Sequence, residues 1–444
     1  MAHADTVAQG RARALAAAGV TWRGALVAAA FPLLFLHVRF QPGFAIDVGP
    51  TSLNVELSDI AVLVLAAAAA REGVSSGFGR LRAARWTWAA AVALLLWIGI
   101  EAIRVGHATH VVSAAKFAEY ALLAPALVLL LRRAEDVTAA LAAVVGWSVA
   151  ATAAGLLQFF GVDILDAWPA GRRQPSFLGH LDFAGLSGMA LTIGLLWLAL
   201  ARRGAFVALA TGAIGLVLAG ASAGAVGFAA AAALLVLWAR LRTLASTRTI
   251  VAAGAAAAVA GTGLLLLRGH DFDQFLRFLG VRHEEASTQT HVQTYAQHTL
   301  LAYIGWKIFT AHPVAGVGWQ GSAEPEHYRP VVPAAHRRFP DVAEVAFPAP
   351  SRPYGVQNAY VQVLADLGVI GLVLWLALFA VPIVLGVRTA LRAPPATAGI
   401  AALGAAWLLL TLGLWIPQNL VAGLPLDALI WLGIGVVATA AARA

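Results

Sequence analysis

The sequence predicts an all-α polytopic membrane protein with about twelve transmembrane helices and one large extracytoplasmic loop. Of its 444 residues, 60% are hydrophobic and only 12% are charged, whereas a soluble domain carries roughly 25% charged residues. The apolar residues form runs close to the ~20 residues that cross a bilayer as a helix. One polar stretch, 268–357, interrupts these runs late in the chain. A loop of this length usually carries function, since ordering it costs entropy.

Twelve apolar segments are interpreted as membrane spans, nine before the polar loop and three after it. The chain therefore divides into 1–267 with spans one to nine, the loop 268–357, and 358–444 with spans ten to twelve. The predicted spans are 24–38, 57–71, 86–103, 113–131, 137–159, 181–200, 205–220, 224–239, 250–267, 358–386, 397–416 and 425–442.

Basic residues alternate between the two sets of loops that these spans define. One set carries 17 arginines, whereas the opposite short loops and helix ends carry only Arg39, Arg104, Lys116, Arg172 and Arg173. Arginine-rich short loops remain in the cytoplasm, so we expect both termini to be cytoplasmic and the large loop to lie outside. The same bias explains the pI of about 10.5 without a nucleic-acid partner. The absence of cysteine excludes disulfides, thiolate catalysis and cysteine metal sites.

The polar loop holds seven of the twelve histidines and is expected to contain an amphipathic helix over about 288–311. His291, Tyr295 and His298 share one face of that helix, and its apolar side suits packing against the bundle. Histidine can act as a base near neutral pH. Two histidines at helical spacing can also bind a metal, but no third ligand is fixed by spacing, so we expect no metal site. A solvated polar face is the simpler alternative.

Arg172 and Arg173 precede the sixth span on the expected outer side, against the general charge bias. Guanidinium groups suit a diphosphate, because their fork of donors pairs two oxygens at once. The alternatives are anchoring to lipid headgroups or a salt bridge to Asp166 or Asp182.

The chain leaves the loop through two further segments. His312-Pro313 ends the expected helix and is followed by a glycine-containing turn. Arg352, Gln357 and Asn358 precede the tenth span, where free N–H groups at a helix N-terminus suit phosphate. Plain capping by Asn358 is the alternative.

Four of the charged residues inside predicted spans are considered as buried charges. Lys116 and Glu119 are three residues apart and are expected to pair with each other. Asp366 and Asp427 are functional candidates as intramembrane carboxylates, but their shallow positions place them behind the arginines.

These segments, in this order, resemble the bacterial superfamily of O-antigen ligases and polysaccharide polymerases. His312-Pro313, two residues, then Gly316-Val317-Gly318 is similar to one pattern of that family. The segment from Gln357-Asn358 to Gly371 is similar to a second, apart from its first residue, which is histidine in the family. The stretch from Arg172 to Ala184 resembles a third. The resemblance in architecture covers nearly the whole chain.

The resemblance implies an inverting transfer of a glycan from a polyprenyl-diphosphate carrier to an acceptor outside the cytoplasmic membrane, without metal or other cofactor. It also implies external arginines on the diphosphate and a histidine base for the acceptor hydroxyl. The chain departs from the pattern at three positions. Gln357 replaces the family histidine, His298 stands where an arginine is usual, and Ser222-Ala223-Gly224 lacks an arginine. Either His298, His291 or Arg352 substitutes, or the activity is altered or lost.

We therefore predict a ligase-like glycosyltransferase of the bacterial cytoplasmic membrane. Its partners are the carrier-linked glycan donor, a lipid or glycan acceptor and membrane lipids. The predicted catalytic residues are His298, Gln357, Asn358 and Arg352. The predicted substrate-binding residues are Arg172, Arg173, His180, His291 and His312. The alternatives are a polysaccharide polymerase, or a non-catalytic transporter or binding protein for lipid-linked glycan.

Overall fold

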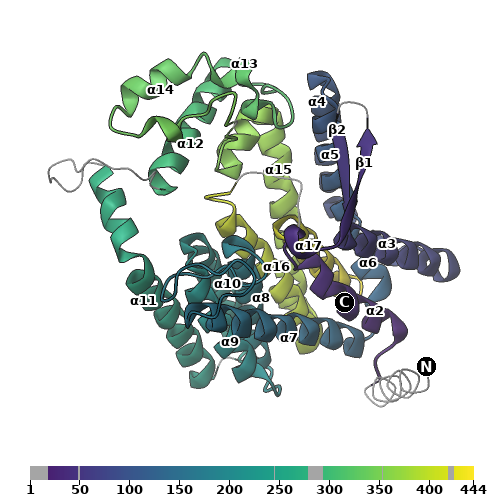
Figure 1. Ribbon diagram of the computed structural model, residues 1–444. Helices are drawn as coiled ribbons and strands as arrows, with labels where there is room; N and C mark the ends of the chain where they lie inside the picture. Colours follow the sequence, from purple (N-terminus) through teal and green to yellow (C-terminus); the bar gives the residue numbers. More distant parts are fainter. Residues whose placement is uncertain (1–18, 49–50, 245, 279–293, 353, 419–424) are drawn as a thin grey trace, which may run out of the picture.

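The computed structural model describes residues 19–48, 51–244, 246–278, 294–352, 354–418 and 425–444 (Figure 1). Within these ranges the chain is almost entirely helical. The α-helices are α2 (Trp22–Leu34), α3 (Leu57–Ser76), α4 (Arg85–Val105), α5 (Ala108–Ala121), α6 (Leu123–Leu130), α7 (Ala134–Phe159), α8 (His180–Ala199), α9 (Ala205–Ala219), α10 (Ser222–Leu241), α11 (Thr247–Phe278), α12 (Thr294–Ala311), α13 (Pro325–Tyr328), α14 (Val332–Arg338), α15 (Ala359–Arg392), α16 (Pro395–Leu414) and α17 (Leu426–Ala441). The 3-10 turns are η1 (Val38–Phe40), η2 (Gly79–Ala84), η3 (Gly321–Ala323) and η4 (Glu344–Ala346).

Each predicted span overlaps a helix of this list, and the span 113–131 overlaps two of them, α5 and α6. Among the described residues, eight helical segments are long and apolar enough to cross a membrane, and α2, α9 and α17 are shorter apolar helices. The remaining predicted span corresponds to α3, which carries Asp59, Arg71 and Glu72. The structure thus supports a polytopic helical membrane protein, while twelve crossings remain a prediction. The eight segments are Gly79–Val105, Ala108–Leu130, Ala134–Phe159, His180–Ala199, Ser222–Leu241, Ile250–Gly269, Ala359–Arg392 and Pro395–Leu414.

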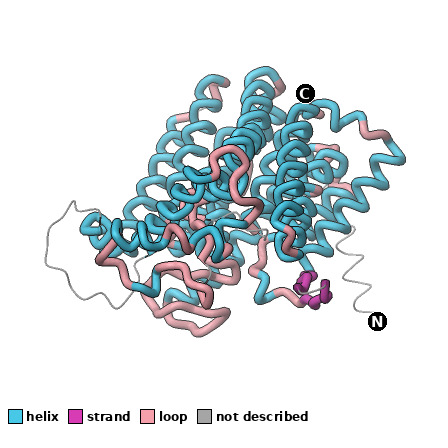
Figure 2. The backbone as a smooth tube through the Cα atoms, turned by 90° about the horizontal axis from the view of Figure 1, so that it is seen from above, coloured by secondary structure: helices cyan, strands magenta, loops and turns pink. Residues whose placement is uncertain are grey.

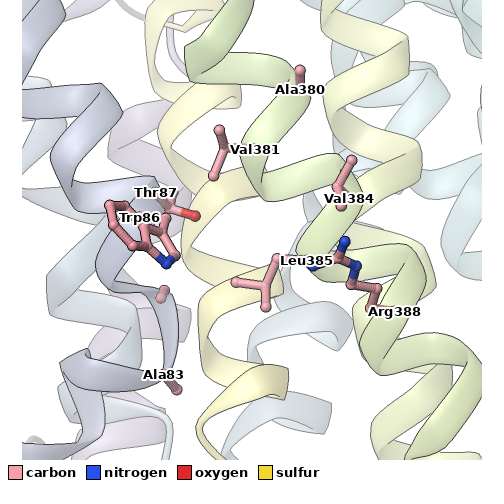
Figure 3. A pocket seen from close by; sticks show the side chains of 9 residues that line it. Ala83, Trp86, Thr87, Ala380, Val381, Val384, Leu385 and Arg388 are labelled. Atoms are coloured by element: carbon pink, nitrogen blue, oxygen red, sulfur yellow. The ribbon is translucent and has the colours of Figure 1, made fainter.

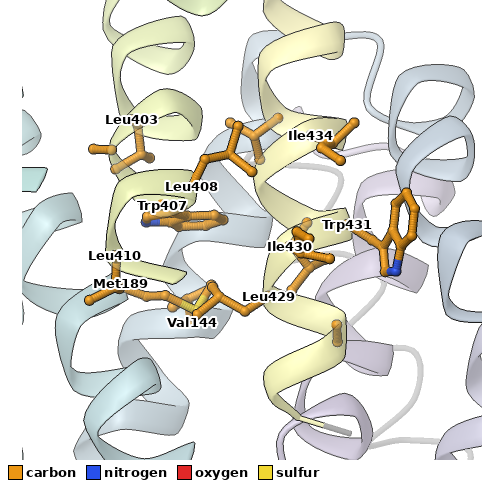
Figure 4. Close-up of a cluster of buried hydrophobic side chains, with 14 of the residues drawn as sticks. Val144, Met189, Leu403, Trp407, Leu408, Leu410, Leu429, Ile430, Trp431 and Ile434 are labelled. Atoms are coloured by element: carbon orange, nitrogen blue, oxygen red, sulfur yellow. The ribbon is translucent and has the colours of Figure 1, made fainter. Parts of the chain in front are cut away.

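The centre of the bundle is an apolar layer between α8, α16 and α17 (Figure 4). Met189, Leu410 and Leu429 lie together there and are fully buried. Trp407 donates a hydrogen bond from its indole nitrogen to Thr192 Oγ1 (2.9 Å), which satisfies the polar end of a buried aromatic ring. These central helices form the most buried part of the described bundle.

A β-hairpin is the one departure from the all-α prediction in the described part of the chain. Strands β1 (Gly43–Val48) and β2 (Thr51–Glu56) pair antiparallel at the edge of the molecule (Figure 2). Apolar residues alternate along both strands, and Phe44 faces Val55 while Ile46 faces Leu53. Such cross-strand pairs stabilise a hairpin. The alternation of apolar residues was overlooked because the segment is too short to cross a membrane and was interpreted as a connection.

The predicted pair of Lys116 and Glu119 is wrong. Lys116 forms its ion pair with Asp59 of α3. The Asp59 carboxylate also accepts the Glu56 backbone N–H (2.7 Å) at the start of α3. Asp59 is buried, and a buried carboxylate is costly unless an opposite charge lies beside it. Lys116 supplies that charge, and the ion pair joins α5 to α3.

Candidate functional site

Basic side chains from three distant segments meet at the turn that ends α9. The Arg268 Nη1 donates to the Gly220 carbonyl (3.2 Å), and His180 Nδ1 lies 3.2 Å from the Ala219 carbonyl. Gly220 has φ +60°, and a Cβ there would lie 2.7 Å from Arg173 Cβ. Only glycine allows Arg173 to approach this turn so closely. We call Arg173, His180, Arg268 and His298 the basic cluster.

Trp168 orders two members of the basic cluster. The Arg173 guanidinium lies 4.6 Å from the centroid of the Trp168 ring, and the His180 ring meets the same indole edge-on at 4.4 Å. Gln174 holds the segment in place, because its backbone N–H donates to Leu218 O (2.8 Å). The Arg173 charge is therefore held against the end of α9 by a cation–π contact and by the fixed backbone.

The tautomer of His180 follows from its surroundings. Since Nδ1 faces a carbonyl oxygen, it carries a proton, and Nε2 of the neutral ring is then an acceptor. Nε2 is buried and has no hydrogen-bond partner among the described residues. Both Arg173 and Arg268 lie within electrostatic range of this ring.

His298 joins the basic cluster from α12. Burial, with a further contribution from the nearby Arg268 charge, lowers the pKa of His298 to about 4. The opposite side of α12 is anchored by Leu300, Leu301 and Ile304, which are at most 2% exposed. His298 is therefore neutral at pH 7 and held beside Arg268. The expected helix over 288–311 begins in residues outside the described ranges, and so does His291.

The other predicted site residues make different contacts. Arg172 is exposed. Arg352 donates from Nη1 to Val345 O (2.9 Å). Asn358 caps α15 by accepting the Val361 N–H (3.0 Å), as the simpler alternative expected.

Gln357 and His312 likewise stand apart from the basic cluster. Gln357 Oε1 is buried without a partner in the described part of the chain. His312 is exposed, and its ring centroid lies 6.3 Å from that of His327. No hydrogen bond or ion pair between described residues links Arg352, Gln357 or Asn358 to the basic cluster. Asp166, considered as a partner for the arginine pair, instead binds Arg39 (2.6 Å).

The turn 313–318 and the kink 365–370 of α15 interlock through their backbones, and we call this pair of segments the glycine lock. Gly316 (φ +71°) lies against the Asp366 carbonyl and Gly368 (φ +66°) against the Val314 carbonyl, where a Cβ would overlap those atoms. The kink at Gly368 leaves the N–H groups that follow it free to bond across. Four hydrogen bonds join the segments: Val317 N to Ala365 O (2.9 Å), Gly318 N to Asp366 O (2.8 Å), Val369 N to Pro313 O (2.9 Å) and Ile370 N to Val314 O (3.3 Å).

Asp366 lies at the centre of the glycine lock and is 1% exposed. Its carboxylate accepts hydrogen bonds from the backbone N–H groups of Gln320 (3.1 Å) and Ser322 (2.9 Å) and from Gln362 Nε2 (3.0 Å). The folded loop covers this end of α15 and encloses Asp366, whose shallow depth in the membrane stays a prediction. The enclosed carboxylate ties the loop to the helix.

Residues 205–376 match the family model described as O-Antigen ligase. This part of the chain is therefore similar to the O-antigen ligase family. It extends from the start of α9 to the middle of α15, and so contains Arg268, His298 and both halves of the glycine lock. The family comprises ligases and polymerases of glycosyltransferase type that act on lipid-linked glycans. A comparison with curated proteins gave no match.

Arg268 is the member of the basic cluster that sequence reasoning missed. It was treated only as the first residue of the polar loop. The sequence nonetheless carried a signal, since Arg268 directly follows a long apolar run. In the structure its side chain is only 6% exposed. A charged side chain at the end of a membrane span is a functional candidate by default when it points into the helix bundle.

One apolar cavity lies apart from this site. Its volume is about 360 Å³, and it lies between the start of α4 and the second half of α15 (Figure 3). Trp86, Val384 and Leu385 line it, with Arg388 at one side. None of the predicted site residues contributes to it.

Proposed function

We propose that the protein transfers a glycan from a polyprenyl-diphosphate carrier to an acceptor at the outer face of the cytoplasmic membrane. The observation that carries the proposal is the meeting of Arg173 and Arg268 at the end of α9, beside two neutral histidines. Two guanidinium groups on one short turn suit the oxygens of a diphosphate. The similarity to the O-antigen ligase family supports a donor of this kind.

The proposed reaction is an inverting displacement. The acceptor hydroxyl oxygen forms a bond to the anomeric carbon while the bond from that carbon to the diphosphate oxygen breaks. The diphosphate leaves with the electron pair and gains negative charge, and the hydroxyl proton passes to a base. Fixed positive charge beside the leaving group stabilises that transition state, so the proposal requires no catalytic metal.

We assign the base, or a direct contact to phosphate, to His298. In the free protein its pKa of about 4 makes it a weak base. A bound diphosphate would offset the Arg268 charge that contributes to this low value, and the pKa of His298 would then rise toward neutrality. Donor binding would thereby prepare the base. Gln357 has no proton-accepting nitrogen, and we assign it, with Asn358 and Arg352, to positioning of the acceptor.

Two other functions remain candidates. A polymerase would use the same cluster to extend the glycan on its carrier. A transporter or binding protein is favoured by one observation, Gln357 in the position of the family histidine. Mass analysis of the glycolipids before and after incubation with the purified protein separates the three. A ligase moves the glycan to a new acceptor, a polymerase lengthens it, and a transporter forms no new glycosidic bond.

The decisive variant is the double substitution Arg172→Ala with Arg173→Ala. We expect it to abolish transfer in a reconstituted assay while the protein still inserts and purifies normally, because the donor diphosphate loses Arg173, one of the two cations that meet at the end of α9. Arg337→Ala, an exposed arginine of the polar loop, is the matched control and should keep wild-type transfer. Undiminished transfer by the double variant would rule out the diphosphate role.

A further inference from the structure

A second cluster of ligand-type side chains lies where the polar loop rests on the turn between α4 and α5. His107 and His110 occupy the first turn of α5, and Glu324 precedes α13. One nitrogen of each histidine and one carboxylate oxygen all lie within 4.8 Å of one another. Glu324 is more than 200 positions away from the two histidines in the chain, so only the folded loop brings the three residues together.

The distances agree with those between the ligands of a small metal ion. His110 Nε2 lies 2.9 Å from Glu324 Oε1, and His107 Nδ1 lies 3.6 Å from the same oxygen. Two ligands of a tetrahedral zinc ion with bonds of 2.0–2.1 Å are about 3.4 Å apart. The two carboxylate–imidazole separations are close to this spacing, and the two histidine nitrogens, which lie within 4.8 Å of each other, would have to approach by up to about 1.4 Å to seat an ion between the three groups.

The hydrogen bonding of His110 prepares it to bind a metal. His110 is buried, and its Nδ1 contacts the Trp319 carbonyl. That carbonyl requires a proton on Nδ1, so the neutral ring directs the lone pair of Nε2 toward the Glu324 carboxylate. Two acceptors then face each other, which is unfavourable unless a cation lies between them. A backbone carbonyl on the far nitrogen is the usual support of a metal-binding histidine.

The surroundings hold both halves of the cluster rigidly. Trp319 is fully buried, and its indole nitrogen donates to Ser113 Oγ (3.1 Å) on the same helix as His110. Arg104 donates to the Gly316 carbonyl (3.0 Å), and Glu101 neutralises it at 2.6 Å. Arg104, at the end of the neighbouring α4, is thus already paired, which weakens its repulsion of a metal ion.

We propose that His107, His110 and Glu324 bind one divalent transition-metal ion of the Zn²⁺ type, which fastens the polar loop to the α4–α5 turn. Two imidazoles and one carboxylate are a common donor set for zinc, with water in the fourth position. The role is structural, because the basic cluster is built from other elements, and the proposal holds whether or not the chain transfers glycan.

The test is a titration of the full-length protein in detergent with Zn²⁺ after removal of metals by a chelator. We expect one ion per chain in the wild type and at least a 10-fold loss of affinity in His107→Ala and in Glu324→Gln. Both side chains are partly exposed, so these variants should fold. The matched controls are Glu326→Gln and His327→Ala, neighbouring residues that pair with each other at 3.2 Å, and they should bind as the wild type does.

Two further readouts separate this site from unspecific binding. Co²⁺ in place of Zn²⁺ should give the visible absorption of a four-coordinate ion in the wild type but not in Glu324→Gln. Bound Zn²⁺ should also slow trypsin cleavage after the exposed Arg338 of the polar loop several-fold in the wild type only. The proposal is overturned if the wild type binds no ion, or if His107→Ala and Glu324→Gln bind Zn²⁺ as tightly as the wild type. In that case His110 is protonated and forms a plain ion pair with Glu324.

Discussion

The glycine lock and the basic cluster differ in how completely their polar groups are satisfied. In the lock, backbone N–H groups pair across the two segments and the Asp366 carboxylate has three donors. In the cluster, His180 Nε2 is buried without a described partner, and Arg173 and Arg268 converge at one turn. The best-matched motifs lie in the lock, where the described backbone groups bond to one another. We therefore expect the resemblance there to report architecture, and we assign the proposed chemistry to the cluster.

The largest expected effect breaks the lock. Gly316→Ala places a Cβ against the Asp366 carbonyl at a backbone angle that only glycine adopts easily. We expect a loss of about 3 kcal/mol or more in the free energy of unfolding, measured by thermal unfolding in detergent. Gly261→Ala is the control, because a Cβ there meets open space within α11. Equal stability of both variants would mean that the interlocked backbones do not hold the loop.

The next effect tests the cluster without disturbing the lock. Arg268→Ala should lower the rate of glycan transfer about 100-fold, the usual cost of removing one donor to a developing oxyanion. Arg268→Lys should recover only part of that loss, since lysine keeps the charge but not the fork of donors. Transfer rates at saturating donor measure both. A fully active Arg268→Ala protein of normal stability would remove Arg268 from the site.

The smallest effect is a pH dependence that sharpens the role of His298. Its pKa is lowered from 6.5 to about 4 in the folded protein, so the unfolded chain binds its proton at the higher pH. The contribution of His298 to the free energy of unfolding is therefore complete above about pH 6.5, and it is lost as the pH falls toward 4. The loss between pH 7 and pH 5 should be on the order of 1 kcal/mol. His298→Gln should reduce this dependence, measured as the difference in Tm between the two pH values. An unchanged difference would show that His298 is solvated.

The spans were predictable because an apolar run of membrane length is a local property of the sequence. The turn at Gly316 and the start of a helix at Asn358 were predictable for the same reason, because a few neighbouring residues determine each of them. The basic cluster was only half predictable, since Arg173 and Arg268 are brought together by the end of α9 and not by any spacing in the chain. The hairpin was overlooked for a different reason, as its alternation lies in a segment interpreted as a connection. Lys116 shows the same limit, because its partner comes from another helix.

Asp366 has a consequence for how the protein is assembled during synthesis. Its carboxylate is enclosed, and two of its three donors belong to Gln320 and Ser322 in the preceding loop. These residues leave the ribosome before α15 does. If the loop has not folded when α15 arrives, the helix brings an acidic group into the bilayer without partners, at a cost of several kcal/mol. Insertion of the tenth predicted span is thus coupled to prior folding of the loop. We expect the start of α15 to be the last part of that helix to reach its final position.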